Sequence, residues 1–236
     1  MKKYSAFAAA AALTLALTAC ASGGTSGASS ASGAPAQPVP AQVSVQNTPQ
    51  GQPRILIAYF SYGENAELPA GADASASASV QPTADGMTGN TGLVARDIQK
   101  AAGGDLFSIR TEKPYPSGYD ATVDQGRVEQ QQGARPALST HIPNLADYDV
   151  IFLGYPNWWG DMPMALYTFL DEYDFSGKTI IPFCTSGGSR LSDTVEAIRR
   201  AEPGAVVMDG FHVSGSSASG AESTVANWVK TLHLAQ

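Results

Sequence analysis

Cysteine is scarce in this chain of 236 residues, which contains only Cys20 and Cys184. Small exported domains commonly depend on several disulfide bonds, and two cysteines allow one at most. If Cys20 carries another group, Cys184 has no partner and no disulfide is available. Because Cys184 follows the apolar run 180–183, a buried, unreactive thiol is favoured over a reactive one.

Histidine is also scarce, with only His141, His212 and His233. These residues lie far apart in the sequence and lack the spacing of metal ligands, so we expect no metal site. His212 follows the last predicted strand and could border a ligand crevice, although a solvated or hydrogen-bonded structural role is favoured.

Basic residues are outnumbered, because the chain has 14 Lys and Arg against 21 Asp and Glu and a formal net charge of −7. No basic cluster is present, which argues against binding to nucleic acid and against a polybasic lipid-binding surface. The sequence also lacks the Gly-x-Gly-x-x-Gly fingerprint, the Gly-x-Ser-x-Gly elbow and the Gly-x-x-x-x-Gly-Lys loop. These absences disfavour the corresponding nucleotide-binding and hydrolase classes.

The first twenty residues have the pattern of a secretory signal. Lys2 and Lys3 supply a positive start, and residues 6–16 form an apolar run too short to span a bilayer as a mature helix. Residues 17–20 (Leu-Thr-Ala-Cys) resemble a bacterial lipobox, in which the cysteine is diacylated and becomes N-terminal. We therefore expect residues 1–20 to be a lipoprotein signal peptide ending at Cys20. The lipid would anchor an exported protein to the cell membrane or outer membrane, on the extracytoplasmic face; a cleaved signal without lipid is the alternative.

Residues 21–53 are mostly Ser, Gly, Ala, Pro and Gln, and none of them is acidic or basic. Such a segment cannot bury enough apolar area to become ordered, so we expect a disordered linker. Residues 54–236 remain for a single domain with a sizeable core.

Apolar runs and amphipathic segments alternate along this domain. The strand 149–155 is almost entirely apolar, as expected for a strand buried on both faces. The alternation predicts an α/β fold with a doubly wound, five-stranded parallel sheet in three layers. Strands are predicted at 55–60, 105–110, 149–155, 178–184 and 205–208, and helices at 92–102, 119–132, 163–171, 191–201 and around 225–232.

Ligands of such sheets bind in the crevice beyond the carboxyl ends of the strands, which directs attention to the loops 61–90, 155–162 and 185–190. The first loop ends in Thr88-Gly89-Asn90-Thr91, directly before a predicted helix. Free N–H groups and small hydroxyl side chains at a helix start suit a phosphate, while an ordinary helix cap is the alternative. Within this loop, residues 62–87 form an insertion rich in Ala, Ser and Gly, which we interpret as a mobile surface excursion.

The other two loops offer surfaces for a flat ligand. The second contains Trp158 and Trp159; one indole is expected to line the site, and the other to pack under the following helix. In the third loop, Gly187 and Gly188 would let the backbone approach a ligand, or would form a plain tight turn.

These motifs together resemble the flavodoxin-like family, and within it an exported lipoprotein member. The resemblance runs from about Arg54 to Leu234. It is carried by the segments 59–61 (Tyr-Phe-Ser), 89–91 (Gly-Asn-Thr), 154–159 (Gly-Tyr-Pro-Asn-Trp-Trp), 169–170 (Phe-Leu), 174–178 (Asp-Phe-Ser-Gly-Lys) and 183–189 (Phe-Cys-Thr-Ser-Gly-Gly-Ser).

The resemblance implies a sheet in the order 2-1-3-4-5 and non-covalently bound FMN. The insertion is a departure from the family, since it separates Ser61 from the rest of a loop that is compact in ordinary flavodoxins. By position, the FMN phosphate would be held by Ser61, Thr88, Gly89, Asn90 and Thr91, and the isoalloxazine ring would lie between Pro156, Asn157, Trp158, Trp159 and Gly160 on one side and Thr185, Ser186, Gly187 and Gly188 on the other.

The resemblance also implies electron transfer outside the cytoplasm, between a donor and an acceptor that are redox proteins or small molecules. The flavin would carry the chemistry, so no catalytic residue is assigned. Two alternatives stay open: an FMN-dependent NAD(P)H or quinone reductase, and a binding module that kept the fold without the flavin.

Overall fold

A computed structural model of the chain describes residues 51–68, 80–84 and 86–234, all of which lie in one compact unit, Pro40–Gln236. The predicted signal peptide 1–20, including Cys20, lies outside the described residues, as do most of the predicted linker 21–53 and the middle of the insertion. No helix in the described part of the chain is long and apolar enough to cross a membrane.

The centre of the domain is a parallel sheet, which confirms the predicted α/β fold. Its strands are β1 (Ile55–Tyr59), β4 (Asp105–Ser108), β5 (Val150–Pro156), β6 (Thr179–Ser186), β7 (Val206–Val207) and β8 (Phe211–Ser214). They pair in the order β4-β1-β5-β6-β7, with β8 also on β6. Read along the chain, this is the order 2-1-3-4-5. Strand β5 is buried at every position, as its apolar sequence predicts.

The fifth position of the sheet differs from the prediction of one strand at 205–208. It is filled by two short strands, because β7 pairs with the start of β6 and β8 with its end. Between them the backbone passes close to Leu191, since a Cβ on Gly210 would lie 2.8 Å from Leu191 Cδ2. The sheet therefore has six strands, and His212 lies inside β8 and not after the last strand.

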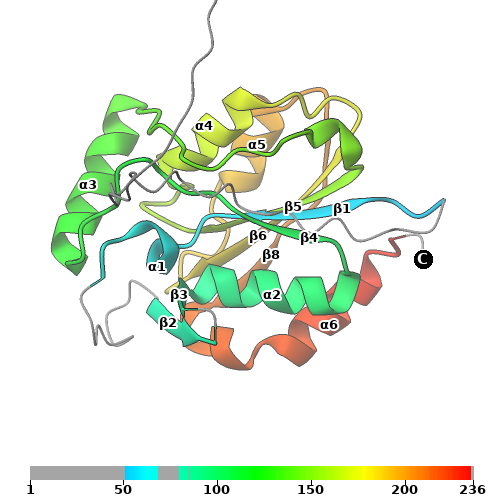
Figure 1. Cartoon of the computed structure of the whole chain (residues 1–236), viewed down its shortest axis with the longest axis horizontal. Coiled ribbons are helices and arrows are strands. Elements are labelled where there is room, and N and C mark those ends of the chain that lie inside the picture. Colours follow the sequence, from blue (N-terminus) through cyan, green and yellow to red (C-terminus); the bar gives the residue numbers. More distant parts are fainter. Residues whose placement is uncertain (1–50, 69–79, 85, 235–236) are drawn as a thin grey trace, which may run out of the picture. The chain divides into compact units, whose positions relative to one another are not determined.

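Helices cover both faces of the sheet and complete three layers (Figure 1). The helices α2 (Asn90–Ala102) and α6 (Glu222–Thr231) lie on one face, and α3 (Tyr119–Gln132), α4 (Met164–Glu172) and α5 (Thr194–Ala201) lie on the other. Adjacent strand residues alternate between the two cores: Ile57 packs with α2 and α6, whereas Leu56 faces the α4 layer. Short 3-10 turns occur at Leu145–Asp147 and Gly215–Gly220.

The described ends of the insertion pack onto the domain, which differs from the expected surface excursion. After β1 the chain forms the short helix α1 (Tyr62–Asn65), and it returns as an antiparallel hairpin of β2 (Val80–Thr83) and β3 (Gly86–Gly89). Tyr62 and Val80 are buried. This hairpin lies beside the beginning of α2 (Figure 1). The ends of the insertion pack onto the domain because two apolar side chains are buried there. The sequence does not reveal this, because the composition of the insertion is similar to that of the linker.

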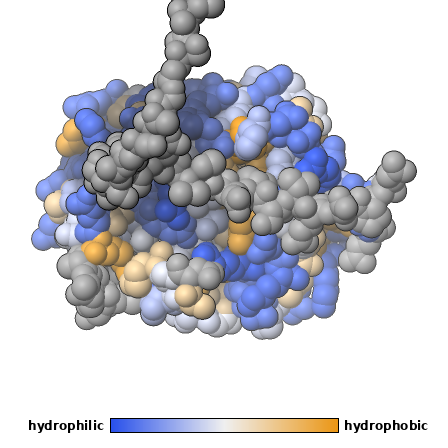
Figure 2. All heavy atoms as spheres, in the orientation of Figure 1, coloured by the Kyte–Doolittle hydropathy of each residue, from blue (hydrophilic) through white to orange (hydrophobic). Residues whose placement is uncertain are grey.

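The burial of Cys184 and the hydrophilic character of the surface agree with what the sequence predicts. Cys184 is a free thiol with 1% of its surface exposed, and burial raises its pKa to about 12. The prediction of a buried thiol is confirmed, and its low reactivity stays a prediction. On the face of the molecule in Figure 2, hydrophilic side chains predominate among the coloured residues, and apolar ones form small separate groups.

Candidate functional site

A cavity of about 880 Å³ lies at the carboxyl ends of the strands. This volume falls in the range of small-molecule and cofactor sites. All three predicted loops contribute to it. The predicted site residues that line the cavity are Asn90, Pro156, Asn157, Trp158, Trp159, Gly160, Thr185, Ser186 and Gly187.

Five predicted site residues are not in the cavity lining: Ser61, Thr88, Gly89, Thr91 and Gly188. The hydroxyl of Thr91 is 2.8 Å from that of Thr185, a lining residue, and links α2 to β6. Gly89 is the residue that precedes α2. A role of these residues in cofactor binding stays a prediction.

Ten further residues line the cavity without having been predicted. The turn after β8 follows the carboxyl-edge rule and its run of Ser and Gly residues is a usable signal, so it could have been included. Helix α3 and the insertion reach the cavity through tertiary packing, for which the sequence offers no local signal. These residues are Tyr62, Gln81, Tyr119, Thr122, Val123, Gly126, Ser189, Gly215, Ser216 and Ser219.

Trp159 is held at the mouth of the cavity with 49% of its surface exposed. Its indole N–H donates to the Val123 carbonyl at 3.0 Å, and the Arg127 guanidinium lies over the ring, 5.1 Å from the centroid. The Trp159 backbone has φ of 57°, in the left-handed region that a bulky residue rarely adopts. The loop therefore presents an aromatic ring to the cavity that is held in place and half exposed.

Trp158 both lines the cavity and packs into the core. Its ring meets Phe60 and Tyr115 edge-to-face, with centroid distances of 5.6 and 5.2 Å. A Cβ on Gly126 would lie 3.1 Å from the Trp158 ring, so α3 passes directly over the indole. One indole does pack under a helix as expected, but the helix is α3 and not the following helix, α4.

Hydrogen-bonding groups gather in the cavity where α2 begins. Asn90 is the first residue of α2, two residues earlier than predicted, and its Oδ1 accepts a hydrogen bond from Gln81 Nε2 at 2.9 Å. Asn90 Nδ2 lies 2.9 Å from the position of a Cβ on Gly215, so the turn after β8 is in close contact. The residues that line the cavity include no Lys or Arg, and its polar groups are neutral amides and hydroxyls.

Ser186 joins the cavity to β8. Its Oγ is 2.8 Å from His212 Nε2 and accepts N–H bonds from Arg190 at 2.8 Å and Gly188 at 3.3 Å. Burial, and then the positive charge of Arg190, lower the pKa of His212. In its neutral form, His212 can accept a hydrogen bond at Nε2 from the Ser186 hydroxyl.

Ser61 and Thr88, which the resemblance assigns to phosphate binding, have different environments. The Ser61 hydroxyl is fully buried and has no hydrogen-bond partner among the described residues. The Thr88 hydroxyl donates its proton to the Glu64 carboxylate and has none left for another acceptor.

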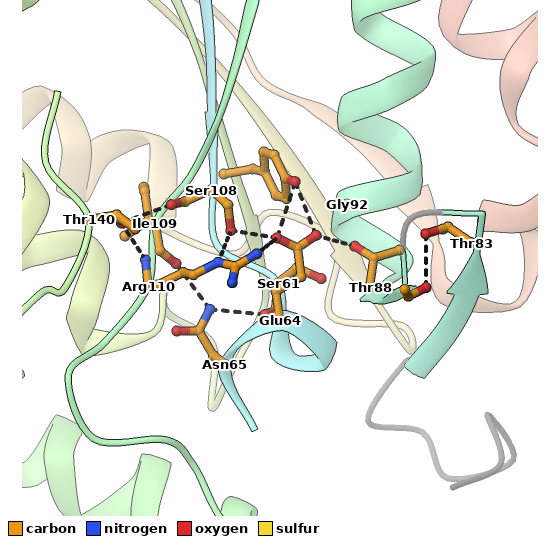
Figure 3. Close-up of polar contacts among 12 residues, drawn as sticks. Ser61, Glu64, Asn65, Thr83, Thr88, Gly92, Ser108, Ile109, Arg110 and Thr140 are labelled. Atoms are coloured by element: carbon orange, nitrogen blue, oxygen red, sulfur yellow. Dashed lines mark hydrogen bonds and ion pairs between the residues drawn. The ribbon is translucent and has the colours of Figure 1, made fainter. Parts of the chain in front are cut away.

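Glu64 is the centre of a polar cluster that the sequence did not reveal (Figure 3). Its side chain is 4% exposed and accepts hydrogen bonds from the hydroxyls of Tyr59, Thr88 and Ser108. Arg96 and Arg110 place guanidinium nitrogens 3.7 and 3.5 Å from the carboxylate oxygens. Burial, and then the charge of Glu64, raise the pKa of Tyr59 to about 12, which keeps Tyr59 a hydrogen-bond donor. The described residues contain no group of His, Cys, Asp and Glu suited to a metal ion.

Comparison with known proteins agrees with this architecture. The sequence model of the flavodoxin family matches residues 83–232. Solved structures of candidate flavoproteins from Bacteroides eggerthii and Bacteroides uniformis are 27% and 28% identical. Each covers 76% of this chain, and the alignments cover 97% and 99% of those chains, with TM-scores of 0.58.

A flavoprotein from Lactobacillus acidophilus, solved in complex with FMN, is 20% identical and shares the fold. It covers 72% of this chain and 99% of its own, with a TM-score of 0.50. A search of curated proteins gives no match. Because the family match spans more than half of the sequence, and fold and strand order agree, the chain belongs to the flavodoxin family.

Proposed function

We propose that the domain binds FMN in this cavity and serves as an electron carrier. The observation that carries the proposal is the pairing of two surfaces in one cavity. We call Tyr119, Trp158 and Trp159 the aromatic wall, and Gln81, Asn90 and Ser216 the polar wall. A flat tricyclic ring with a polar phosphate tail matches these two surfaces.

The residues present are suited to FMN in three further respects. The cavity volume suits a cofactor of this size. The start of α2, a helix of 13 residues, offers free backbone N–H groups and a partial positive charge to a phosphate. The unpartnered buried hydroxyl of Ser61 precedes the insertion that leads to α2 and is a further candidate donor. The FMN complex of the related fold from Lactobacillus acidophilus supports the same choice of cofactor.

Bound FMN would supply the redox chemistry, and the protein would control its position and access. Trp158 is held by Phe60 and Tyr115, so a ring stacked on it would be fixed in orientation. Trp159 is half exposed, so an edge of the flavin ring would stay accessible to a redox partner. No acid or base is needed for electron transfer, and we assign none.

We further propose that the protein acts on the extracytoplasmic face of a membrane, anchored by lipid on Cys20. The support is the sequence of residues 1–20 and the uncharged segment that follows. Mass spectrometry of the protein extracted from membranes would show a diacylated N-terminal cysteine, and Cys20→Ser would release the protein from the membrane fraction. An unmodified, soluble wild-type protein would contradict the anchor.

The cofactor proposal is tested by absorbance spectroscopy of the purified full chain, before and after addition of FMN. We expect visible flavin bands that stay with the protein through gel filtration. Titration with a chemical reductant would then show whether a one-electron state is stabilised. A colourless protein that takes up no FMN would point to the flavin-free binding module, and rapid oxidation of NADH or NADPH by the yellow protein would point to the reductase.

A further inference from the structure

We propose that the inserted hairpin β2–β3 forms part of the ligand site, with Gln81 as a binding residue for the phosphate end of FMN. This inference rests on the proposed function. It assigns to the insertion a role that the family resemblance does not supply, because the insertion is the departure of this chain from ordinary flavodoxins.

The first observation is the position of Gln81. It lies in β2 and lines the cavity, and its Nε2 donates one hydrogen bond to Asn90 Oδ1 at 2.9 Å. A glutamine amide carries a second N–H, for which the described residues provide no acceptor. Because Asn90 begins α2, this N–H lies beside the positive end of the helix, where an anion is favoured.

The second observation is that the hairpin is fixed to the sheet. Thr88 is the register partner of Gln81 in the hairpin, and its hydroxyl donates to buried Glu64. Glu64 also accepts a hydrogen bond from Tyr59 of β1 and forms an ion pair with Arg96 of α2. The residue directly across from Gln81 is thereby tied to the elements that carry the cavity.

Close packing adds to these polar contacts. A Cβ on Gly63 would lie 1.9 Å from the Thr88 carbonyl oxygen, so α1 and β3 touch with no room for a side chain between them. A binding group held in place before the ligand arrives loses little conformational entropy on binding. The Glu64 cluster therefore acts as a positioning device for Gln81.

The third observation is the absence of charge. The cavity lining contains no Lys or Arg, so a phosphate in it would be recognised by neutral donors and by the start of α2. Each neutral donor then contributes a larger share of the difference in affinity between FMN and riboflavin. Riboflavin has the same ring and tail but no phosphate. Gln81 is the donor that the insertion adds.

The test titrates the full chain with FMN and, separately, with riboflavin. Binding is monitored by the quenching of flavin fluorescence. Gln81→Ala should weaken FMN binding roughly ten-fold, the value of a hydrogen bond to a charged group, and leave riboflavin binding unchanged. Gln81→Glu should weaken FMN binding further, because a carboxylate beside the phosphate repels it. Gln131→Ala, the same change at an exposed position of α3 outside the cavity, should alter neither affinity.

The outcomes separate this inference from the proposed function. If wild-type protein binds neither flavin, the proposed function fails and this inference fails with it. If wild-type protein binds FMN and Gln81→Ala binds it equally well, the hairpin is not part of the site. An equal loss for FMN and riboflavin would overturn the assignment to the phosphate end. Retained riboflavin binding in a variant shows that its cavity is folded, and Gln81→Asn, which keeps the amide, provides a second variant.

Discussion

Trp158 of the aromatic wall and Gln81 of the polar wall are held in place by different kinds of contact. Trp158 is packed against Phe60 and Tyr115 in the core, so its position depends on burial of apolar surface. Gln81 is held by a hydrogen bond to Asn90 and by a hairpin tied down through Glu64.

This difference indicates what each wall contributes to recognition. Buried aromatic area supplies affinity for any flat ring, with little dependence on its substituents. Directional hydrogen bonds distinguish a ligand that offers the right acceptor from one that does not. The aromatic wall is therefore expected to determine how tightly a flavin binds, and the polar wall which flavin is bound.

The largest effect is expected from the aromatic wall. Trp159→Ala should weaken the binding of both FMN and riboflavin by about 2 kcal/mol, roughly thirty-fold in Kd, because the stacked area is lost. Trp159→Phe should be intermediate. Isothermal titration calorimetry measures both, and Val128→Ala, exposed on α3 outside the cavity, is the control. Weaker binding of FMN alone would contradict the assignment of general affinity to the aromatic wall and of selectivity to the polar wall.

A smaller effect is expected from the device that positions the polar wall. Glu64→Gln removes a buried charge that accepts three hydroxyl hydrogen bonds and pairs with two arginines, and should lower the free energy of unfolding by about 1.5 kcal/mol. It should also reduce the preference for FMN over riboflavin, because Gln81 is less firmly held. Urea denaturation measures the first effect, with exposed Glu112→Gln as the matched control. An unchanged preference would mean that Gln81 does not depend on the cluster.

The stability of the folded domain is expected to depend on pH through His212, which contacts Ser186 of the third loop. Because its pKa is lower in the folded protein than the ordinary value of 6.5, the neutral form is favoured by folding. Its contribution to stability is complete above 6.5 and is lost as the pH falls below this value toward the folded pKa. We expect His212→Gln, which retains a partner for Ser186, to lose less stability than the wild type between about pH 7.5 and pH 5. Thermal melting at several pH values compares the two, and parallel curves would refute this role.

The smallest effect is expected from salt. The cavity lining has no cationic side chain and the chain has a net charge of −7, so screening removes only a weak general repulsion of FMN. Raising the ionic strength should leave FMN affinity unchanged or increase it by about two-fold at most. A marked decrease would show that a basic residue contacts the phosphate, contrary to the neutral polar wall.

The sequence predicted the framework of the site but not all of its walls. The carboxyl-edge rule identified the loops that contain Trp159 and Ser186, because long apolar strands determine where the edge lies. The contribution of α3 was not predicted, since its contact with Trp158 depends on a glycine, Gly126, at one position of a weakly amphipathic helix.

The insertion was the larger gap in the prediction. Its composition resembles that of the linker, and the burial of Tyr62 and Val80 depends on partners far away in the sequence. The environment of Thr88 could not be predicted either. The Glu64 carboxylate that accepts its hydrogen bond belongs to the segment that was interpreted as a surface excursion. The split fifth strand has a comparable cause in the close approach of Gly210 to Leu191.

The backbone at Trp159 has a consequence for how this loop would change under selection. A left-handed conformation in a bulky residue costs on the order of 1–3 kcal/mol, and Asn or Gly would adopt it with less strain. Selection for thermal resistance alone would therefore replace this tryptophan early, and on the proposed function the more stable domains would bind a flavin more weakly.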